Sequence, residues 1–166
     1  MKTSYLVSPG QTLNQFFGPD AISADTSAVN AELARLLAAL QPPADLATLR
    51  LEYSQGERGV PASPKSPDAA TMTIAGPAGP IELRILVPKV PVRGVYLHIH
   101  GGGWMLGSND TWDQQLELFG REAGMVAVSI DYRLAPEHVF PAAVDDCMAA
   151  AVWLVSIALE PGLGLV

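Results

Sequence analysis

The sequence is poor in cysteine, in basic residues and in long apolar runs. Its 166 residues contain one cysteine, Cys147, which has no partner for an internal disulfide, so a reducing, cytoplasmic location is expected. The net charge of −7 argues against a nucleic-acid partner, because such proteins carry a basic face. The longest apolar run, residues 147–159, is shorter than the roughly 20 residues that span a bilayer. A buried helix is therefore expected there, and no membrane span.

What is present is an apolar, globular composition. Apolar residues make up 49% of the chain and charged residues 16%, against about 25% in ordinary soluble proteins, which excludes a disordered chain. Apolar residues recur at helical spacing over 27–40, which predicts a helix whose apolar stripe packs in the core. The stripe consists of Val29, Leu33, Leu36, Leu37 and Leu40. Residues 54–68 are rich in glycine, proline and serine and predict a linker.

The second half of the chain alternates between strand-like and helix-like segments. The runs 71–75 and 81–87 flank a glycine- and proline-rich turn and predict a hairpin. From residue 94 onward the order is strand, helix, strand, helix, over 94–100, 111–123, 125–130 and 141–159. Within the first of these strands, successive side chains are expected on opposite faces of the sheet. We therefore expect an α/β fold with a mostly parallel sheet and flanking helices.

The segment His100-Gly101-Gly102-Gly103-Trp104 lies where a predicted strand ends and before a predicted helix begins. Three glycines in a row allow positive φ angles and the close approach of a ligand. Their N–H groups can then converge on a cleft, as the developing negative charge of an acyl-transfer oxyanion requires. A phosphate loop is disfavoured, because neither G-x-G-x-x-G nor G-K-[ST] is present. A glycine-rich turn without a ligand stays open for this segment taken alone.

A second informative segment, residues 131–138, reads Asp-Tyr-Arg-Leu-Ala-Pro-Glu-His. Together the two segments resemble the hormone-sensitive-lipase-like branch of the α/β-hydrolases, which includes bacterial esterases and the arylacetamide deacetylases. The resemblance covers residues 27–155 and implies the N-terminal portion of an α/β-hydrolase. It implies a carboxylic-ester hydrolase that works through an acyl-enzyme on a small ester, with no metal and no organic cofactor.

The resemblance also implies a role for each residue of the two segments. Gly102 and Gly103 would donate the oxyanion N–H groups, His100 and Gly101 would shape the loop, and Trp104 would pack beside the pocket. The second segment would support that loop through hydrogen bonds and ion pairs, with the side chains of Asp131, Tyr132, Arg133 and Glu137.

The resemblance divides the chain into three parts. Residues 1–53 would form a helical cap segment, and residues 54–68 a linker. Residues 69–166 would form an incomplete hydrolase core that lacks everything from the nucleophile strand onward.

The catalytic residues of that family are missing from the sequence. The family nucleophile lies in G-x-S-x-G, and none of the serines has glycine on both sides at that spacing. The triad acid and histidine follow the nucleophile in this fold, so all three roles are unfilled. We therefore expect a chain that stops before the catalytic serine, by natural truncation or a frameshift, and that is inactive alone.

Two other functional readings stay open, a non-catalytic binding fold and an inactive fragment. The plant gibberellin receptors share this fold and use the pocket for a ligand without catalysis, which is the model for the first. In either case the strand 94–100 would be an exposed apolar edge without its neighbour, which predicts self-association or aggregation.

The remaining polar side chains are interpreted as structural. His98 and His100 lie two apart on one strand face, but no third ligand stands at metal-binding spacing. Asp145 and Asp146 are interpreted as favourable charges near a helix N-terminus rather than as an acid/base pair. Cys147, inside an apolar helix, is interpreted as an inert buried thiol.

Overall fold

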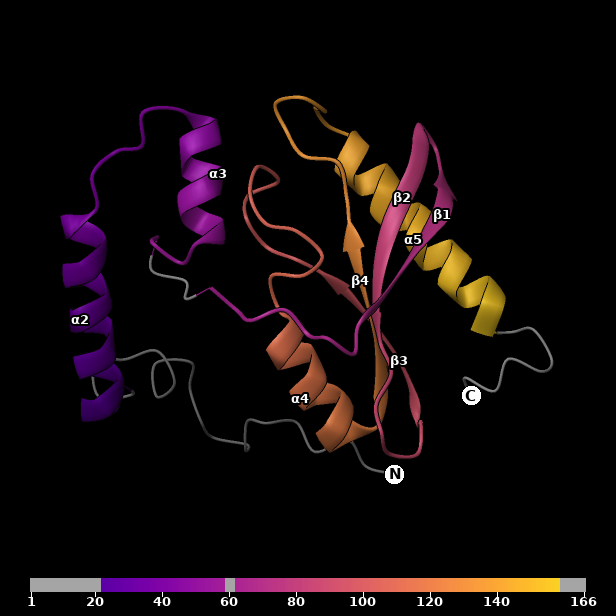
Figure 1. The fold of residues 1–166 in the computed structure, drawn as a ribbon. Helices are drawn as coiled ribbons and strands as arrows, with labels where there is room; N and C mark the ends of the chain where they lie inside the picture. The colour runs from indigo at the N-terminus through magenta and orange to yellow at the C-terminus, as the bar shows by residue number, and fades with distance from the viewer. Residues whose placement is uncertain (1–21, 59–61, 159–166) are drawn as a thin grey trace, which may run out of the picture. The chain divides into compact units, whose positions relative to one another are not determined.

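The computed structural model describes residues 22–58 and 62–158, and the chain divides into two compact units with a boundary between Pro42 and Pro43. In the first unit the described element is α2 (Ala24–Ala39), labelled in Figure 1. The helix begins after Ser23, whose hydroxyl accepts a hydrogen bond from the Thr26 N–H at 3.1 Å. The predicted helix over 27–40 is thus confirmed, with a start three residues earlier.

The apolar stripe of α2 is exposed rather than buried. Val29 is 66% exposed and Leu33 is 43% exposed, and no residue of the helix is buried. The prediction that the stripe packs in the core is wrong for the described structure. The physical reason is the lack of a neighbour, since within residues 22–42 no second helix or strand belongs to this unit.

The second unit is built on a four-stranded sheet with the spatial order β1-β2-β4-β3. Its strands are β1 (Ala70–Gly76), β2 (Gly79–Leu86), β3 (Gly94–Ile99) and β4 (Met125–Asp131). The predicted hairpin is confirmed, because β1 and β2 are antiparallel and Gly76 pairs with Gly79 across a tight turn. β3 and β4 are parallel, as expected for strands joined by a crossover helix.

The expectation of a mostly parallel sheet is wrong for the described strands, whose sheet is mixed. β1 with β2 and β2 with β4 are antiparallel pairs, and β3 with β4 is the parallel one. The reason lies in the hairpin. A turn as short as the one between Gly76 and Gly79 cannot carry the chain across the sheet, which a parallel connection requires.

The helices α4 (Asp113–Ala123) and α5 (Ala142–Ala158) pack on opposite faces of this sheet (Figure 1). Val128 and Ile130 of β4 belong to the apolar cluster that includes Ala150 of α5. Ala127, whose side chain points the other way, packs with Leu116 of α4. None of the helices within residues 22–58 and 62–158 is long and apolar enough to span a bilayer.

β3 follows the alternation that its sequence predicts. Val95 and Leu97 pack against the cluster on the α5 side. On the other face, the ring of Tyr96 lies 4.8 Å from the ring of Phe119 in α4. The strand is thereby held on both faces, and the loop that follows its last residue starts from a defined point.

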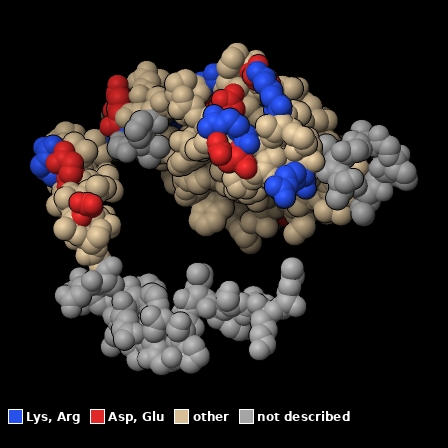
Figure 2. Space-filling view, turned by 90° about the horizontal axis from the view of Figure 1, so that it is seen from below, with Lys and Arg blue, Asp and Glu red and all other residues tan. Residues whose placement is uncertain are grey.

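The remaining helix, α3 (Leu46–Ser54), belongs to the second unit. It begins at Asp45, whose carboxylate accepts the N–H of Thr48 at 2.7 Å. Arg50, from the middle of α3, reaches the loop that follows β3. On the face that Figure 2 shows, basic and acidic side chains are scattered over a mostly uncharged surface.

β3 is an edge strand of the sheet, so one of its sides has no described strand beside it. Ile99 at its carboxyl end is 51% exposed. Along α5, the large apolar side chains of Met148, Val152 and Val155 are exposed as well. The described part of the chain therefore has an apolar, uncharged edge of the kind that promotes pairing with other chains.

We expect a lysine at this edge to lower self-association of the chain, because a charge disfavours edge-to-edge pairing. Ile99→Lys should shift the sedimentation-velocity profile toward the monomer. Gln114→Lys, exposed on α4 rather than on an edge strand, is the matched control and should leave the profile unchanged. A wild-type chain that sediments as a monomer at every concentration would contradict the expectation.

Candidate functional site

The loop that follows β3 turns tightly on its glycines. Gly102 has a φ of +130° and Gly103 a φ of +62°, in the region that favours glycine. The Gly102 carbonyl accepts hydrogen bonds from the N–H groups of Met105 and Leu106, at 3.2 and 3.0 Å. A Cβ on Gly102 would stand 2.1 Å from the Leu106 carbonyl oxygen, so this position requires glycine.

The carbonyl oxygens of the same loop are bound from outside it. The donors come from α3 and from the segment after β4. The Tyr132 hydroxyl donates to His100 O at 2.7 Å, and the Ala135 N–H donates to Trp104 O at 2.8 Å. Arg50 Nε donates to Met105 O at 2.9 Å. These carbonyl groups therefore face the body of the second unit.

The N–H groups of Gly102 and Gly103 donate no hydrogen bond within the described residues. Gly103 lines a cavity of about 470 Å³ with mostly apolar walls. Two unpaired N–H groups in succession are able to bind an acceptor, above all a carbonyl oxygen that gains negative charge. These are the two residues that the glycine motif predicts as donors, and they lie beyond the carboxyl end of β3.

Trp104 borders two apolar cavities. It lines the first together with Phe140 and His138, and a second one of about 350 Å³ together with Ile99 and Met148. Its φ is +60°, a conformation that is rare for a large side chain. The surrounding hydrogen bonds must compensate for this backbone strain.

The ring of His100 is buried and stacks on the ring of Tyr132, with centroids 4.2 Å apart and planes 14° apart. Burial lowers the pKa of His100 and raises the pKa of Tyr132 to about 12. Both side chains are therefore uncharged at neutral pH. The Tyr132 hydroxyl thus keeps the proton that it donates to the His100 carbonyl.

The segment after β4 is held by an ion pair to α5. Arg133 forms a bidentate ion pair with Asp146, with Nε–Oδ2 and Nη2–Oδ1 distances of 2.8 Å. Asp146 is 1% exposed, so its charge depends on this partner. The interpretation of Asp145 and Asp146 as helix-end charges is incomplete, because Asp145 lies in the first turn of α5 but Asp146 is an ion-pair partner.

At the end of β4, Asp131 accepts the N–H of Asn109 at 3.3 Å, and burial raises the pKa of Asp131.

Arg50 forms a second forked ion pair, with Glu137. The Nη1–Oε1 and Nη2–Oε2 distances are 2.7 and 2.8 Å, and the guanidinium lowers the pKa of Glu137 to about 2. The family resemblance implies a supporting role for Glu137, but it does not point to Arg50. No spacing rule connects two residues 87 positions apart, so the sequence carries no local signal for this pair.

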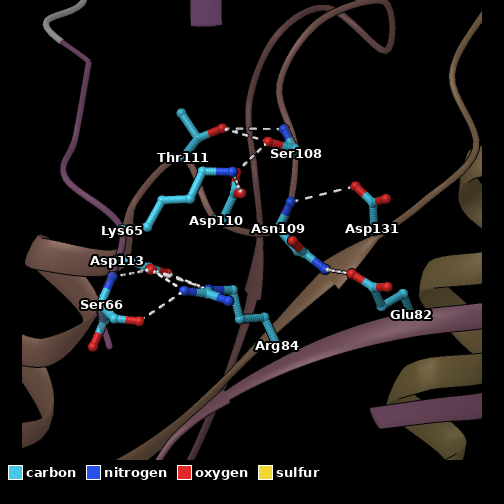
Figure 3. Close-up of polar contacts among 10 residues, drawn as sticks. All are labelled: Lys65, Ser66, Glu82, Arg84, Ser108, Asn109, Asp110, Thr111, Asp113 and Asp131. Atoms are coloured by element: carbon cyan, nitrogen blue, oxygen red, sulfur yellow. Dashed lines mark hydrogen bonds and ion pairs between the residues drawn. The ribbon is translucent and has the colours of Figure 1, made fainter. Parts of the chain in front are cut away.

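The far end of the loop is fixed by the polar network drawn in Figure 3. The Ser108 hydroxyl donates to Asp110 at 2.6 Å, and Lys65 pairs with the same carboxylate. The buried side chain of Asn109 donates to Glu82 of β2 at 3.0 Å. These contacts join the loop to the sheet and to the segment that precedes β1.

A buried charge lies below this network, at the first residue of α4. Asp113 is fully buried and forms a bidentate ion pair with Arg84 of β2, with an Nε–Oδ1 distance of 2.8 Å and an Nη2–Oδ2 distance of 2.5 Å. The Ser66 N–H donates to the same carboxylate at 2.7 Å. The carboxylate is thus compensated by one cation and one peptide dipole, and the start of α4 is tied to β2 (Figure 3).

Of the other polar candidates, Cys147 borders the second cavity together with Trp104, whereas His98 lines neither cavity. Among the described residues, no group of three His, Cys, Asp or Glu has the geometry of a metal site. The ring of His98 faces α4, 6.5 Å from the ring of Trp112, and burial lowers its pKa. Cys147 is partly buried, and burial raises its pKa, as for an unreactive thiol.

Comparisons with known proteins agree on one family. A family model described as alpha/beta hydrolase fold matches residues 96–163. Esterase LipI of Mycobacterium tuberculosis is 40% identical over 114 residues, which cover 65% of this chain and 36% of LipI. The arylesterase of Saccharolobus solfataricus is 42% identical over 84 residues, or 50% of this chain and 28% of that protein.

A solved structure shows the same resemblance in three dimensions. A hyperthermophilic esterase from the archaeon Pyrobaculum calidifontis matches with a TM-score of 0.67 and 35% identity. The match covers 81% of this chain and 44% of that one. The chain therefore spans less than half the length of these relatives.

We expect Gly102→Ala to destabilise the fold and Gly101→Ala to be tolerated. The first combines a positive φ with a clash against the Leu106 carbonyl, and a strained backbone of this kind costs about 1–3 kcal/mol. A Cβ on Gly101 meets nothing within 4 Å, so its change in unfolding free energy should stay within about 0.5 kcal/mol. Urea denaturation of both variants measures the difference. Equal stabilities would contradict it.

The Arg50–Glu137 pair should appear in the pH dependence of stability. Glu137 has a pKa of about 2 in the folded chain against an ordinary value of 4.5, so its contribution is present above pH 4.5 and is lost as the pH falls toward 2. Glu137→Gln should flatten the loss of unfolding free energy in that window, measured by urea denaturation at each pH. Glu122→Gln, on the exposed surface of α4, is the control. Identical slopes for Glu137→Gln and wild type would refute the assignment.

Proposed function

The chain belongs to the α/β-hydrolase family, and from that premise we propose that it supplies the oxyanion hole of a carboxylic-ester hydrolase. The observation that carries the proposal is that the N–H groups of Gly102 and Gly103 have no partner within residues 22–58 and 62–158, with an apolar cavity beside Gly103. The names of the relatives support it, since LipI and the Pyrobaculum protein are both described as esterases.

The arrangement acts on the charge that forms during acyl transfer. When a nucleophile adds to an ester carbonyl, the carbonyl oxygen becomes an oxyanion. N–H donors aimed at that position stabilise the tetrahedral intermediate more than the ester, which lowers the barrier. Loss of one such donor costs roughly 10²–10³-fold in kcat in a comparable site. The apolar cavity beside Trp104 would take the uncharged acyl or alcohol group of a small ester.

The segment after β4 has a supporting role in this proposal. Tyr132 holds the His100 carbonyl, and Ala135 holds the Trp104 carbonyl. The side chain of Arg133 ties the segment to α5. None of these groups would touch the ester; they would keep the donors aimed at one point. The proposal requires no metal and no organic cofactor.

The nucleophile must come from residues outside these 166. No serine of the sequence lies in G-x-S-x-G. Ser108, the one that follows the oxyanion loop, donates its hydroxyl proton to Asp110, and no histidine contacts it among the described residues. The roles of nucleophile, base and orienting acid are therefore assigned to further polypeptide. Residues 1–53, with α2 and α3, are assigned to a helical cap segment.

The first experiment is to sequence the coding DNA through and beyond codon 166 and translate it in three frames. We expect one frame to encode G-x-S-x-G followed by an acid and a histidine. The protein translated through that frame should hydrolyse p-nitrophenyl butyrate and become labelled on one serine by a phosphonate. The 166-residue chain alone should show no phosphonate-sensitive hydrolysis, because it offers oxyanion donors without a nucleophile.

Each other outcome favours a different function. Saturable binding of a small apolar molecule without turnover would favour the receptor-like alternative, for which the apolar cavity is the relevant observation. Phosphonate-sensitive hydrolysis by the 166-residue chain would place the nucleophile within it. The absence of G-x-S-x-G in all frames would leave the oxyanion loop as part of an inactive fragment.

A further inference from the structure

We propose that Arg50 of α3 is the positioning residue that fixes the loop carrying the N–H groups of Gly102 and Gly103, the second of which lines the cavity. The proposal rests on the function proposed above for those groups. Arg50 does not reach the cavity, and it acts on the donors through the peptide groups that follow them. Nothing in the local sequence around Arg50 connects it with the glycine loop.

The guanidinium of Arg50 joins two loops that are far apart in the sequence. Its Nε donates to Met105 O at 2.9 Å, and its Nη2 donates to Ala135 O at 2.9 Å. The two terminal nitrogens also bind the Glu137 carboxylate, at 2.7 and 2.8 Å. A guanidinium is planar, so one side chain sets these three acceptors relative to one another.

The contact with Met105 acts directly on the glycine turn. The Met105 carbonyl and the Leu106 N–H belong to one peptide group. The Leu106 N–H donates to the Gly102 carbonyl at 3.0 Å, and Arg50 binds the Met105 carbonyl oxygen. A peptide group that is bound at both ends cannot rotate freely. The peptide group that consists of the Gly102 carbonyl and the Gly103 N–H is therefore held in place through the Met105–Leu106 peptide group.

The contact with Ala135 acts on the same turn by a second route. The Ala135 N–H donates to Trp104 O at 2.8 Å, while the Ala135 carbonyl accepts from Arg50. Trp104 is held at a φ of +60°, which is unfavourable for a residue with a side chain. Such a conformation persists only where the surroundings impose it. Without Arg50 the strained loop would lose two of the contacts that impose it.

Arg50 positions the loop through its hydrogen bonds to Met105 O and Ala135 O, and not through its charge. Glu137→Gln removes the ion pair but leaves the donors to Met105 O and Ala135 O in place. Arg50→Lys keeps a positive charge beside Glu137 but replaces the fork with a single ammonium, which cannot bind both carbonyls in the same plane. The two variants therefore separate positioning of the loop from pairing of charges.

The sequence offers a selective probe of the two donors. The only Gly-Gly peptide bonds in the chain are 101–102 and 102–103. In protein labelled with glycine that carries ¹³C at the carbonyl and ¹⁵N at the amide, an HNCO spectrum therefore contains two signals, from Gly102 and Gly103. Gly101→Ala removes one of them and assigns the pair. The ¹⁵N–¹H spectrum of the same sample includes Gly94 and Gly124, at the ends of β3 and α4, which report on the fold.

We expect Arg50→Lys to move both HNCO signals to the shifts of unstructured glycine, while Gly94 and Gly124 keep theirs. Glu137→Gln should leave all four in place. Arg35→Lys, on exposed α2, is the matched control and should also change nothing. The proposal is overturned if Arg50→Lys leaves both signals unchanged, or if Glu137→Gln moves them equally. It is also overturned if Gly94 and Gly124 are lost with them, because Arg50 would then support the whole fold.

The outcome is independent of the ester assay. Unmoved signals together with hydrolysis by the longer protein would remove Arg50 from the site and leave the oxyanion hole. Moved signals together with no hydrolysis would leave Arg50 as the residue that positions the loop, and the proposed function would fail.

Discussion

A peptide group in a trans chain carries its N–H and its C=O on opposite sides, and the structure around the loop after β3 depends on this constraint. The Gly103 N–H shares its peptide group with the Gly102 carbonyl, which accepts hydrogen bonds from the N–H groups of Met105 and Leu106. The Gly102 N–H shares its peptide group with the Gly101 carbonyl, whose oxygen lies 2.9 Å from His100 Nδ1. With these carbonyls held, the N–H groups of Gly102 and Gly103 are left without partners among the described residues. The chemistry proposed for the chain follows from which side of each peptide group is occupied.

Buried ion pairs place the segments that make those bonds. Arg133–Asp146 ties the segment after β4 to α5, and Arg84–Asp113 ties the start of α4 to β2. Pairs of this kind add little net stability, because desolvation offsets much of the attraction. They do penalise arrangements in which a buried carboxylate lacks its cation. In a chain with only 16% charged residues, the forked pairs serve mainly to specify where two loops lie.

The second unit exposes apolar surface, and its relatives have additional residues that have no counterpart in this chain. β3 has a free edge among the described strands, and apolar side chains of α5 are exposed. The Pyrobaculum esterase matches this chain over 44% of its own length, so more than half of that protein has no counterpart here. The proposed oxyanion loop and the absence of G-x-S-x-G from the sequence would both fit a site assembled from more polypeptide than these residues.

The structural features that depend on residues close together in the chain could be predicted from the sequence alone. Helical spacing predicts the helix over 27–40, alternation predicts β3, and consecutive glycines predict the loop, because each pattern lies within a short stretch of sequence. The folded structure was needed to show that α2 packs against no other helix or strand within residues 22–42 and that the sheet is mixed. It was also needed to show that Arg50 binds the loop after β3 and that Asp146 binds the segment after β4. Ion pairs between distant segments leave no periodic trace in a sequence, since their partners meet only after the chain has folded.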